Sequence, residues 1–219
     1  MSQILELIRN QNFSYLHPIF YRNKNVLRCE LSKTHHGMAD RNEAYKHAME
    51  IFDILFPHGA DALFFHFTVT DASLCEDYNF SKQEIKYMSE YMHEQMHFLF
   101  SFPANKREVI EHLDIDREYA PPEIIKRNRI IYFANDDKTG LNEKALIKRL
   151  TSPKEGRLQN FEPSFVSFDN ECIFTIYDER GCDIFFADKE KYNIFYQKLA
   201  SNLFDYDLER MLLNYQDNA

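Results

Sequence analysis

The sequence predicts an α+β fold with a mostly antiparallel sheet, a C-terminal three-strand meander and several helices packed against the sheet. Three observations lead to it. Short runs of alternating apolar residues indicate strands, longer runs with apolar residues every three or four positions indicate helices, and the two kinds occur in mixed order along the chain. We expect a single domain over residues 1–219, with one soft point of division near 103–125.

The N-terminal part contains a strand, a helix and a second strand. Residues 26–31 are short and apolar enough for a strand. Residues 42–56 repeat apolar side chains at helical spacing, and Pro57 and Gly59 follow as a stop signal. Residues 61–69 form a nearly continuous apolar run, which predicts a strand.

The middle of the chain is predicted to be mainly helical. After a capping Ser81, residues 82–100 form a second long amphipathic helix. We expect a helix at 106–113, a strand at 129–134 and a short helix at 142–150.

The C-terminal part carries the strongest strand pattern. Three alternating runs are separated by turn residues, at 164–168, 172–177 and 182–188. From 188 to 215 the apolar spacing is helical and predicts one final helix.

Composition and charge exclude several classes of protein. The 219 residues carry 35 acidic against 26 basic side chains, a formal charge of -9. Residues 151–219 contain 13 acidic and 7 basic side chains, so the C-terminal third is the acidic pole. Such a charge repels phosphate backbones, so we expect no direct nucleic-acid ligand. We find no export signal and no membrane-length apolar run, and expect a cytoplasmic protein with no membrane partner.

The distribution of glycine and cysteine argues against bound cofactors. No two of the five glycines lie within ten residues of each other, which disfavours phosphate-binding loops and nucleophile elbows. The four cysteines show no C-x-x-C spacing, so we expect buried thiols and no thiolate metal site. We therefore predict no cofactor.

One motif offers a catalytic alternative. The stretch HEQMH at 93–97 matches the zinc-hydrolase pattern, in which His93 and His97 bind the metal and Glu94 is the general base. On a helical projection both histidines fall away from the apolar face, where Met92 and Met96 lie, and no third ligand follows at the usual spacing. Our main interpretation assigns no metal ligands and no catalytic residues.

The segment between the last two predicted strands is the candidate binding site. It is a tight turn in which Gly181 is expected to take a positive φ and the Asp178 side chain to accept backbone N–H bonds, while Arg180 pairs with Asp178 or Asp183. The turn is polar and lies at the end of a sheet, where partners tend to bind. Residues proposed to contact a partner are Asp178, Glu179, Arg180 and Asp183.

The same residues resemble a family of bacterial domains of unknown function that has a Tyr-Asp-Asp-Arg-Gly turn. The turn reads Tyr-Asp-Glu-Arg-Gly at 177–181, so Glu179 replaces the second aspartate. Residues 205–211 (DYDLERM) are similar to the closing segment of the family, with Leu208 in place of an arginine. Residues 161–187, and the run from LRCELS to LFF near the N-terminus, also look like family strands and a helix. The family brings no established activity.

Together these features predict a non-enzymatic, acidic binding protein. Small acidic cytosolic proteins of this general type are often immunity proteins encoded beside secreted toxins. We therefore expect an immunity protein that neutralises a toxin by direct binding, the partner being a basic protein such as a nuclease. The zinc-dependent hydrolase built on residues 93–97 is the alternative.

Overall fold

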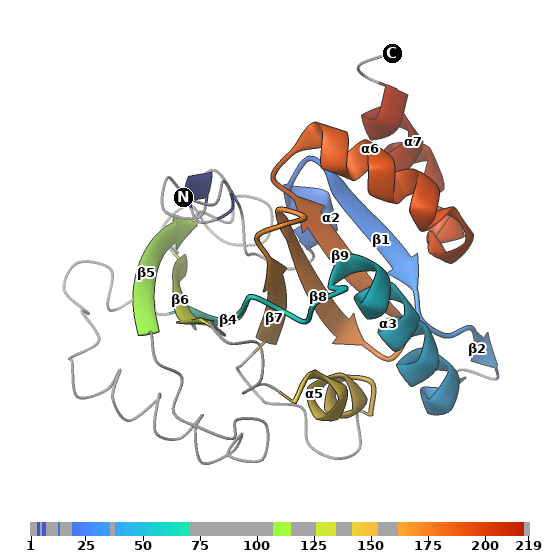
Figure 1. Ribbon diagram of the computed structural model, residues 1–219, viewed down its shortest axis with the longest axis horizontal. Coiled ribbons are helices and arrows are strands. Elements are labelled where there is room, and N and C mark those ends of the chain that lie inside the picture. The colour runs from blue at the N-terminus through green and yellow to red at the C-terminus, as the bar shows by residue number, and fades with distance from the viewer. Residues whose placement is uncertain are drawn as a thin grey trace.

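The computed structural model contains a seven-stranded antiparallel sheet flanked by helices (Figure 1). It describes residues 4, 6–7, 13, 19–35, 38–70, 107–114, 126–134, 142–152 and 162–216. The strands of the large sheet are β1 (Val26–Glu30), β4 (Ala62–Thr70), β5 (Arg107–Asp114), β6 (Lys126–Ala134), β7 (Glu162–Ser167), β8 (Cys172–Asp178) and β9 (Gly181–Phe186). Their spatial order is β1-β9-β8-β7-β4-β6-β5. A small separate hairpin joins β2 (Thr34–His35) and β3 (Met38–Ala39).

The predicted fold class is confirmed. Strands β7, β8 and β9 follow one another in the chain and pair as antiparallel neighbours, which is the predicted C-terminal meander. The helices are α2 (Ile19–Arg22), α3 (Arg41–Leu55), α5 (Glu143–Leu150), α6 (Lys189–Lys198) and α7 (Leu208–Gln216). Two 3-10 turns, η2 (Ala200–Asn202) and η3 (Asp205–Asp207), connect α6 to α7. The molecule therefore combines a largely antiparallel sheet with helices on its faces.

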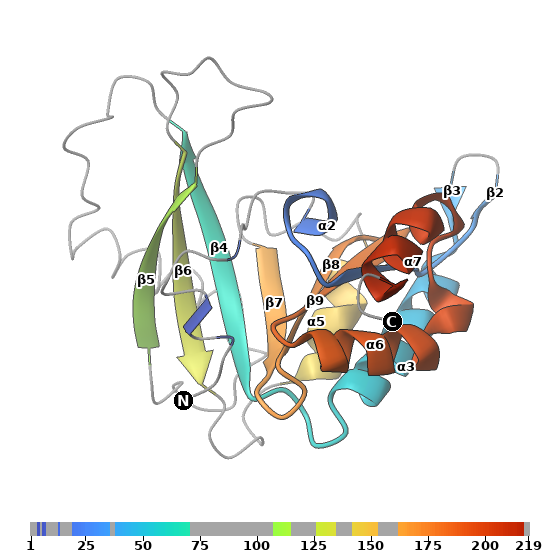
Figure 2. The same cartoon turned by 90° about the horizontal axis from the view of Figure 1, so that it is seen from above.

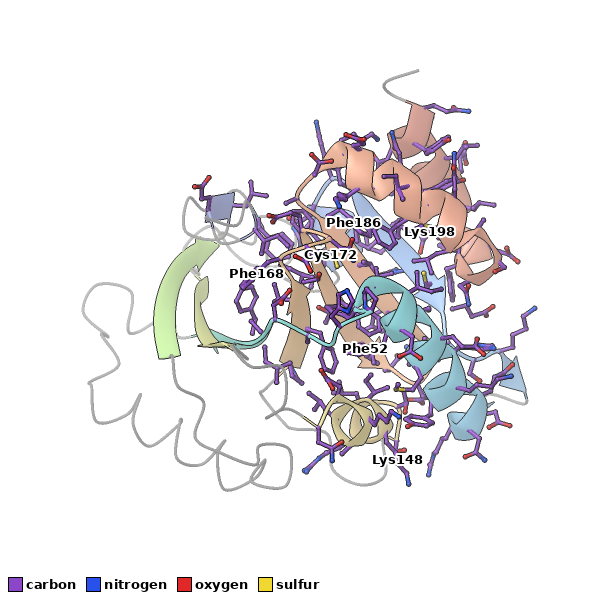
Figure 3. The ribbon with its side chains drawn as sticks, viewed as in Figure 1. Phe52, Lys148, Phe168, Cys172, Phe186 and Lys198 are labelled. Atoms are coloured by element: carbon purple, nitrogen blue, oxygen red, sulfur yellow. The ribbon has the colours of Figure 1, made fainter. Side chains whose placement is uncertain are left out.

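Different helices cover the two faces of the sheet. Figure 2 shows α3, α5 and α6 on one side of β8 and β9, and α2 on the other. On the first side, the rings of Phe52 and Phe165 form a T-shaped pair with 5.1 Å between their centroids, and the stacked rings of Phe186 and Phe195 have the same centroid distance of 5.1 Å. Phe52 and Phe186 thus fill the space between helices and sheet (Figure 3). Burial of these rings supplies a large share of the apolar stabilisation of the fold.

The predicted helix at 42–56 is confirmed as α3, one residue earlier at each end. The Asp40 carboxylate accepts the backbone N–H of Asn42 at 2.9 Å and of Glu43 at 3.2 Å, so it caps the first turn. The helix ends at Leu55, and in the turn that follows Gly59 has a φ of +81°, which suits a residue without a side chain.

Two predicted helices are corrected. Residues 107–113 of the helix predicted at 106–113 lie in strand β5, because Val109 and Ile110 pair with the apolar Ile131 and Ile130 of β6. The single helix expected at 188–215 is broken between α6 and α7, where the backbone of Leu203 bridges to β1. The predicted helix at 82–100, with its HEQMH stretch, lies outside the described residues.

One sheet includes strands from both sides of the expected point of division at 103–125. Strand β4 pairs with β7 along one edge and with β6 along the other. No helix in the described part of the chain is long and apolar enough to cross a membrane.

Candidate functional site

A buried ion pair joins β1 and β9, which are the first and last strands along the chain and neighbours in the sheet. Arg28 lies on β1 directly opposite Asp183 on β9. The Arg28 Nε atom donates to Asp183 Oδ1 at 2.9 Å and Nη2 donates to Oδ2 at 3.3 Å, so the guanidinium binds the carboxylate in a bidentate manner. Arg28 is 9% exposed and Asp183 is 1% exposed. Low exposure makes this pair costly to break, because either charge alone would remain desolvated.

A second buried carboxylate extends the pair toward the C-terminal helices. Asp207 in η3 accepts from Arg28 Nη1 at 3.2 Å and from the Tyr21 hydroxyl at 2.9 Å. The backbone N–H of Phe20 donates to Asp183 at 3.2 Å. We call Arg28, Asp183, Asp207 and Tyr21 the Arg28 network. It connects β1, β9, α2 and η3 through polar side chains.

Aromatic rings surround the guanidinium. The Arg28 Cζ atom lies 4.8 Å from the ring centre of Phe20, 4.9 Å from Tyr21 and 5.3 Å from Tyr177, all within cation–π distance. Burial alone would lower the pKa of Arg28, but its hydrogen bonds and charge interaction with Asp183 outweigh that effect and raise it. Burial raises the pKa of Tyr177, so this ring stays neutral. The Arg28 guanidinium therefore lies among two acidic side chains and three aromatic rings.

The network continues as a polar row across the sheet. Thr175 on β8 lies opposite Asp183, and Ser164 on β7 lies opposite Thr175. Both are buried, and their hydroxyl oxygens are 2.6 Å apart. Because cross-strand partners share a face, these side chains lie on the side of the sheet that α2 covers. The two hydroxyl groups meet each other's hydrogen-bonding needs, as Arg28 and Asp183 do.

The β8–β9 turn closes on itself through Asp178 and Arg180. Asp178 accepts the backbone N–H of Arg180 at 2.8 Å and its Nε at 2.9 Å. The predicted carboxylate partner of Arg180 is therefore Asp178 rather than Asp183. Within the described residues, the buried Oε2 atom of Glu179 has no hydrogen-bond partner.

The reason for glycine at position 181 differs from the prediction. We expected a positive φ, but Gly59 is the single described glycine that has one. A β-bulge leaves Tyr177 without a partner on β9. The Tyr177 hydroxyl occupies the space where a Cβ atom at position 181 would lie, and that atom would also be 3.0 Å from the carbonyl oxygen of Cys29. Close packing, not backbone dihedral, requires this glycine.

The four residues proposed to contact a partner divide into two groups. Asp183 is inside the Arg28 network, and Asp178, 7% exposed, is held by Arg180. Both carboxylates thus have hydrogen-bond partners inside the protein, and contact of the four residues with a partner stays a prediction. The Arg180 side chain is 59% exposed and Glu179 is partly exposed, so these two remain at the surface.

Sequence reasoning missed Arg28 and Tyr21 as members of the site. One signal was present for Arg28, since it is the one basic residue of VLRCEL and lies between apolar neighbours. Asp207 belonged to the closing segment, but nothing in the pattern indicated its partner. Within the described ranges, no three His, Cys, Asp or Glu side chains are grouped to hold a metal, and His93, Glu94 and His97 lie outside them.

The family model described as domain of unknown function (DUF3885) matches residues 6–207. The chain belongs to this family. The matched span of the DUF3885 domain includes Arg28, the 177–181 turn and Asp207, so every member of the Arg28 network falls inside it. No curated protein and no solved structure matches the chain.

Proposed function

We propose that this protein is an acidic, non-enzymatic binding protein of the immunity type, which neutralises a basic toxin in the cytoplasm by direct binding. Charge is the observation that carries the proposal. The chain has a net charge of -9, and 13 of its acidic side chains lie in residues 151–219 against 7 basic ones. An acidic surface accelerates association with a cationic partner and excludes acidic ones. A nuclease is such a partner, because an active site that binds phosphate groups is usually positively charged.

The arrangement of the Arg28 network supports a binding role. Its guanidinium donates to two buried carboxylates of the same chain, and Asp207 accepts two donors. Charged groups that are paired inside the protein stabilise the fold and hold the segments that carry them in place. Tyr206, the sequence neighbour of Asp207, is exposed, and so is the Arg180 side chain, which donates to Asp178 within its turn.

A growth test addresses the proposal directly. The genes flanking the one for this chain are expressed singly in a host cell, with and without the chain. We expect one product to arrest growth and co-expression of the chain to restore it. The purified pair, with the toxin inactivated by mutation, should form a stoichiometric complex by calorimetry, and its association rate should fall as salt increases.

Metal analysis of the purified chain and of a His93→Ala, His97→Ala variant distinguishes the zinc-hydrolase alternative from the binding protein. Stoichiometric zinc that disappears in the variant, together with hydrolytic activity, would contradict the proposal. Rescue of growth by the double variant at the wild-type level is the expected result. If no flanking product is neutralised or bound, the immunity role is wrong.

A further inference from the structure

Exposed apolar side chains gather at one end of the molecule. Seven large hydrophobic side chains are exposed in the described part of the chain, and four of them lie within eight consecutive positions of η3 and α7. They are Tyr206, Leu208, Leu212 and Leu213, and we call them the α7 surface. Tyr206 is 84% exposed, the largest value of the seven. Apolar clusters of this kind on a soluble domain mark interaction sites more often than scattered single residues do.

Helix geometry places the three leucines on the outward side of α7. Leu208 and Leu212 are one turn apart, and Leu213 follows about 100° further round, with Glu209 between them in projection. Met211 lies about 160° from Leu213 and about 60° from Leu208 in projection. It is fully buried, and its sulfur is 3.2 Å from the backbone nitrogen of Arg28. Figure 1 shows α7 beyond β1 at the outer end of the sheet, beside α6.

The α7 surface is held rigidly by buried contacts. Asp207, the neighbour of Tyr206, is bound to Arg28 and Tyr21. The backbone carbonyl of Met211 accepts the buried Tyr192 hydroxyl at 2.7 Å. A side chain presented from a fixed backbone loses less conformational entropy on binding, and tyrosine is enriched among residues that dominate binding energy.

We propose that the α7 surface is the contact site for the partner, a protein with an apolar pocket rimmed by lysine and arginine. Asp205 and Glu209 are exposed at its border beside the exposed Arg210, in a chain whose net charge is -9. Charge complementarity therefore favours a basic partner. It opposes a second copy of the chain, because each copy has a charge of -9. The inference rests on the proposed function and names the surface that performs it.

The test compares matched substitutions on and off the α7 surface. Leu212 is 38% exposed and Ile54 on α3 is 39% exposed, so Ile54→Asp is the control for Leu212→Asp. Tyr206→Ala removes the ring without adding charge. Affinity for the inactivated toxin of the growth test is measured by calorimetry. We expect Tyr206→Ala and Leu212→Asp each to weaken binding by about 30-fold or more, and Ile54→Asp to leave it unchanged.

A second pair of variants separates local from overall charge. Glu209→Lys and Asp53→Lys change the net charge equally, and both side chains are exposed. We expect Glu209→Lys to slow association several-fold more than Asp53→Lys. Thermal unfolding of each variant identifies any loss of fold, and hydrogen exchange in the wild-type complex should show new protection at 205–213.

The outcomes distinguish the two proposals. If the wild type binds the toxin but the α7 variants bind as well as the controls, the inference is wrong and the proposed function stands. If the wild type binds no flanking product, both are overturned. A concentration-dependent dimer that Leu212→Asp dissociates would assign the surface to a second copy and overturn the basic partner.

Discussion

The Tyr177 hydroxyl lies over Gly181, in the space that any larger residue would need for its Cβ atom. Tyr177 is the bulged residue of β8, and its ring also lies 5.3 Å from the Arg28 guanidinium. One ring therefore fixes the β8–β9 turn and covers the buried cation. This relationship links the family turn to the ion network at the edge of the sheet.

We expect Gly181→Ala to destabilise the protein by about 1–3 kcal/mol, because the added methyl group overpacks a filled site. Tyr177→Phe removes the oxygen nearest to that methyl group, so the double variant should recover part of the loss. Urea unfolding of the four proteins measures both effects. A Gly181→Ala protein as stable as the wild type would contradict the packing argument.

Removal of the Arg28 charge should be severe. Arg28→Met leaves Asp183 and Asp207 buried without their counter-ion, at an expected cost of about 3–5 kcal/mol in the free energy of unfolding. The control is Lys46→Met, which removes an exposed pair with Glu50 at 3.8 Å and should cost less than about 0.5 kcal/mol. Chemical denaturation followed by circular dichroism compares them. Equal losses would mean that burial of the network is unimportant.

Stability should fall at alkaline pH, and Tyr192 should contribute. Burial raises its pKa above the ordinary value of 10.0, and the nearby Tyr196 adds a smaller upward effect. The unfolded chain therefore loses this proton first, so stabilisation is complete below about pH 10 and declines as pH rises toward the higher folded pKa.

Tyr192→Phe tests this contribution. The slope of stability against pH above 10 should become less negative by roughly 1.4 kcal/mol per pH unit. At neutral pH the variant should lose about 1 kcal/mol, because the carbonyl of Met211 loses its donor. An unchanged alkaline slope would show that the hydroxyl ionises in the folded state as in water.

The described thiols should be unreactive in the native protein. Cys29, Cys172 and Cys182 are buried and free. Burial raises the pKa of Cys172 and of Cys182, which keeps both as protonated, poorly nucleophilic thiols. Titration with a thiol reagent should leave these three unmodified until denaturant is added, as mass spectrometry of the digested protein would reveal. Rapid labelling of Cys182 in the folded state would disprove this.

Local patterns were sufficient for much of the fold. Helix α3 was predicted because apolar spacing and a stop signal both act within a few residues. The strands of the meander were predicted for the same reason, since alternation and turn residues are short-range features. The Asp178–Arg180 pair also lies within one turn, so it could be anticipated as one of two alternatives.

Elements that depend on distant pairing were not predictable in this way. Residues 107–114 contain helix-compatible charges, and pairing with β6 makes them a strand. The final helix is interrupted because Leu203 and Phe204 bond to the backbone of β1 instead of continuing the helical pattern. Periodicity carries no information about such a neighbour.

The site shows the same division. Sequence patterns identified the 177–181 turn and the acidic C-terminal third, because composition and turn chemistry are local properties. The roles of Arg28, Asp183 and Asp207 depend on the packed fold, since Arg28 and Asp183 are 155 positions apart and become neighbours only when β1 pairs with β9. Asp183 looks like a surface residue in the sequence, but it is buried in the fold. The pairing of β1 with β9 brings the Arg28 guanidinium to its carboxylate, and this ion pair offsets the cost of desolvating the charge.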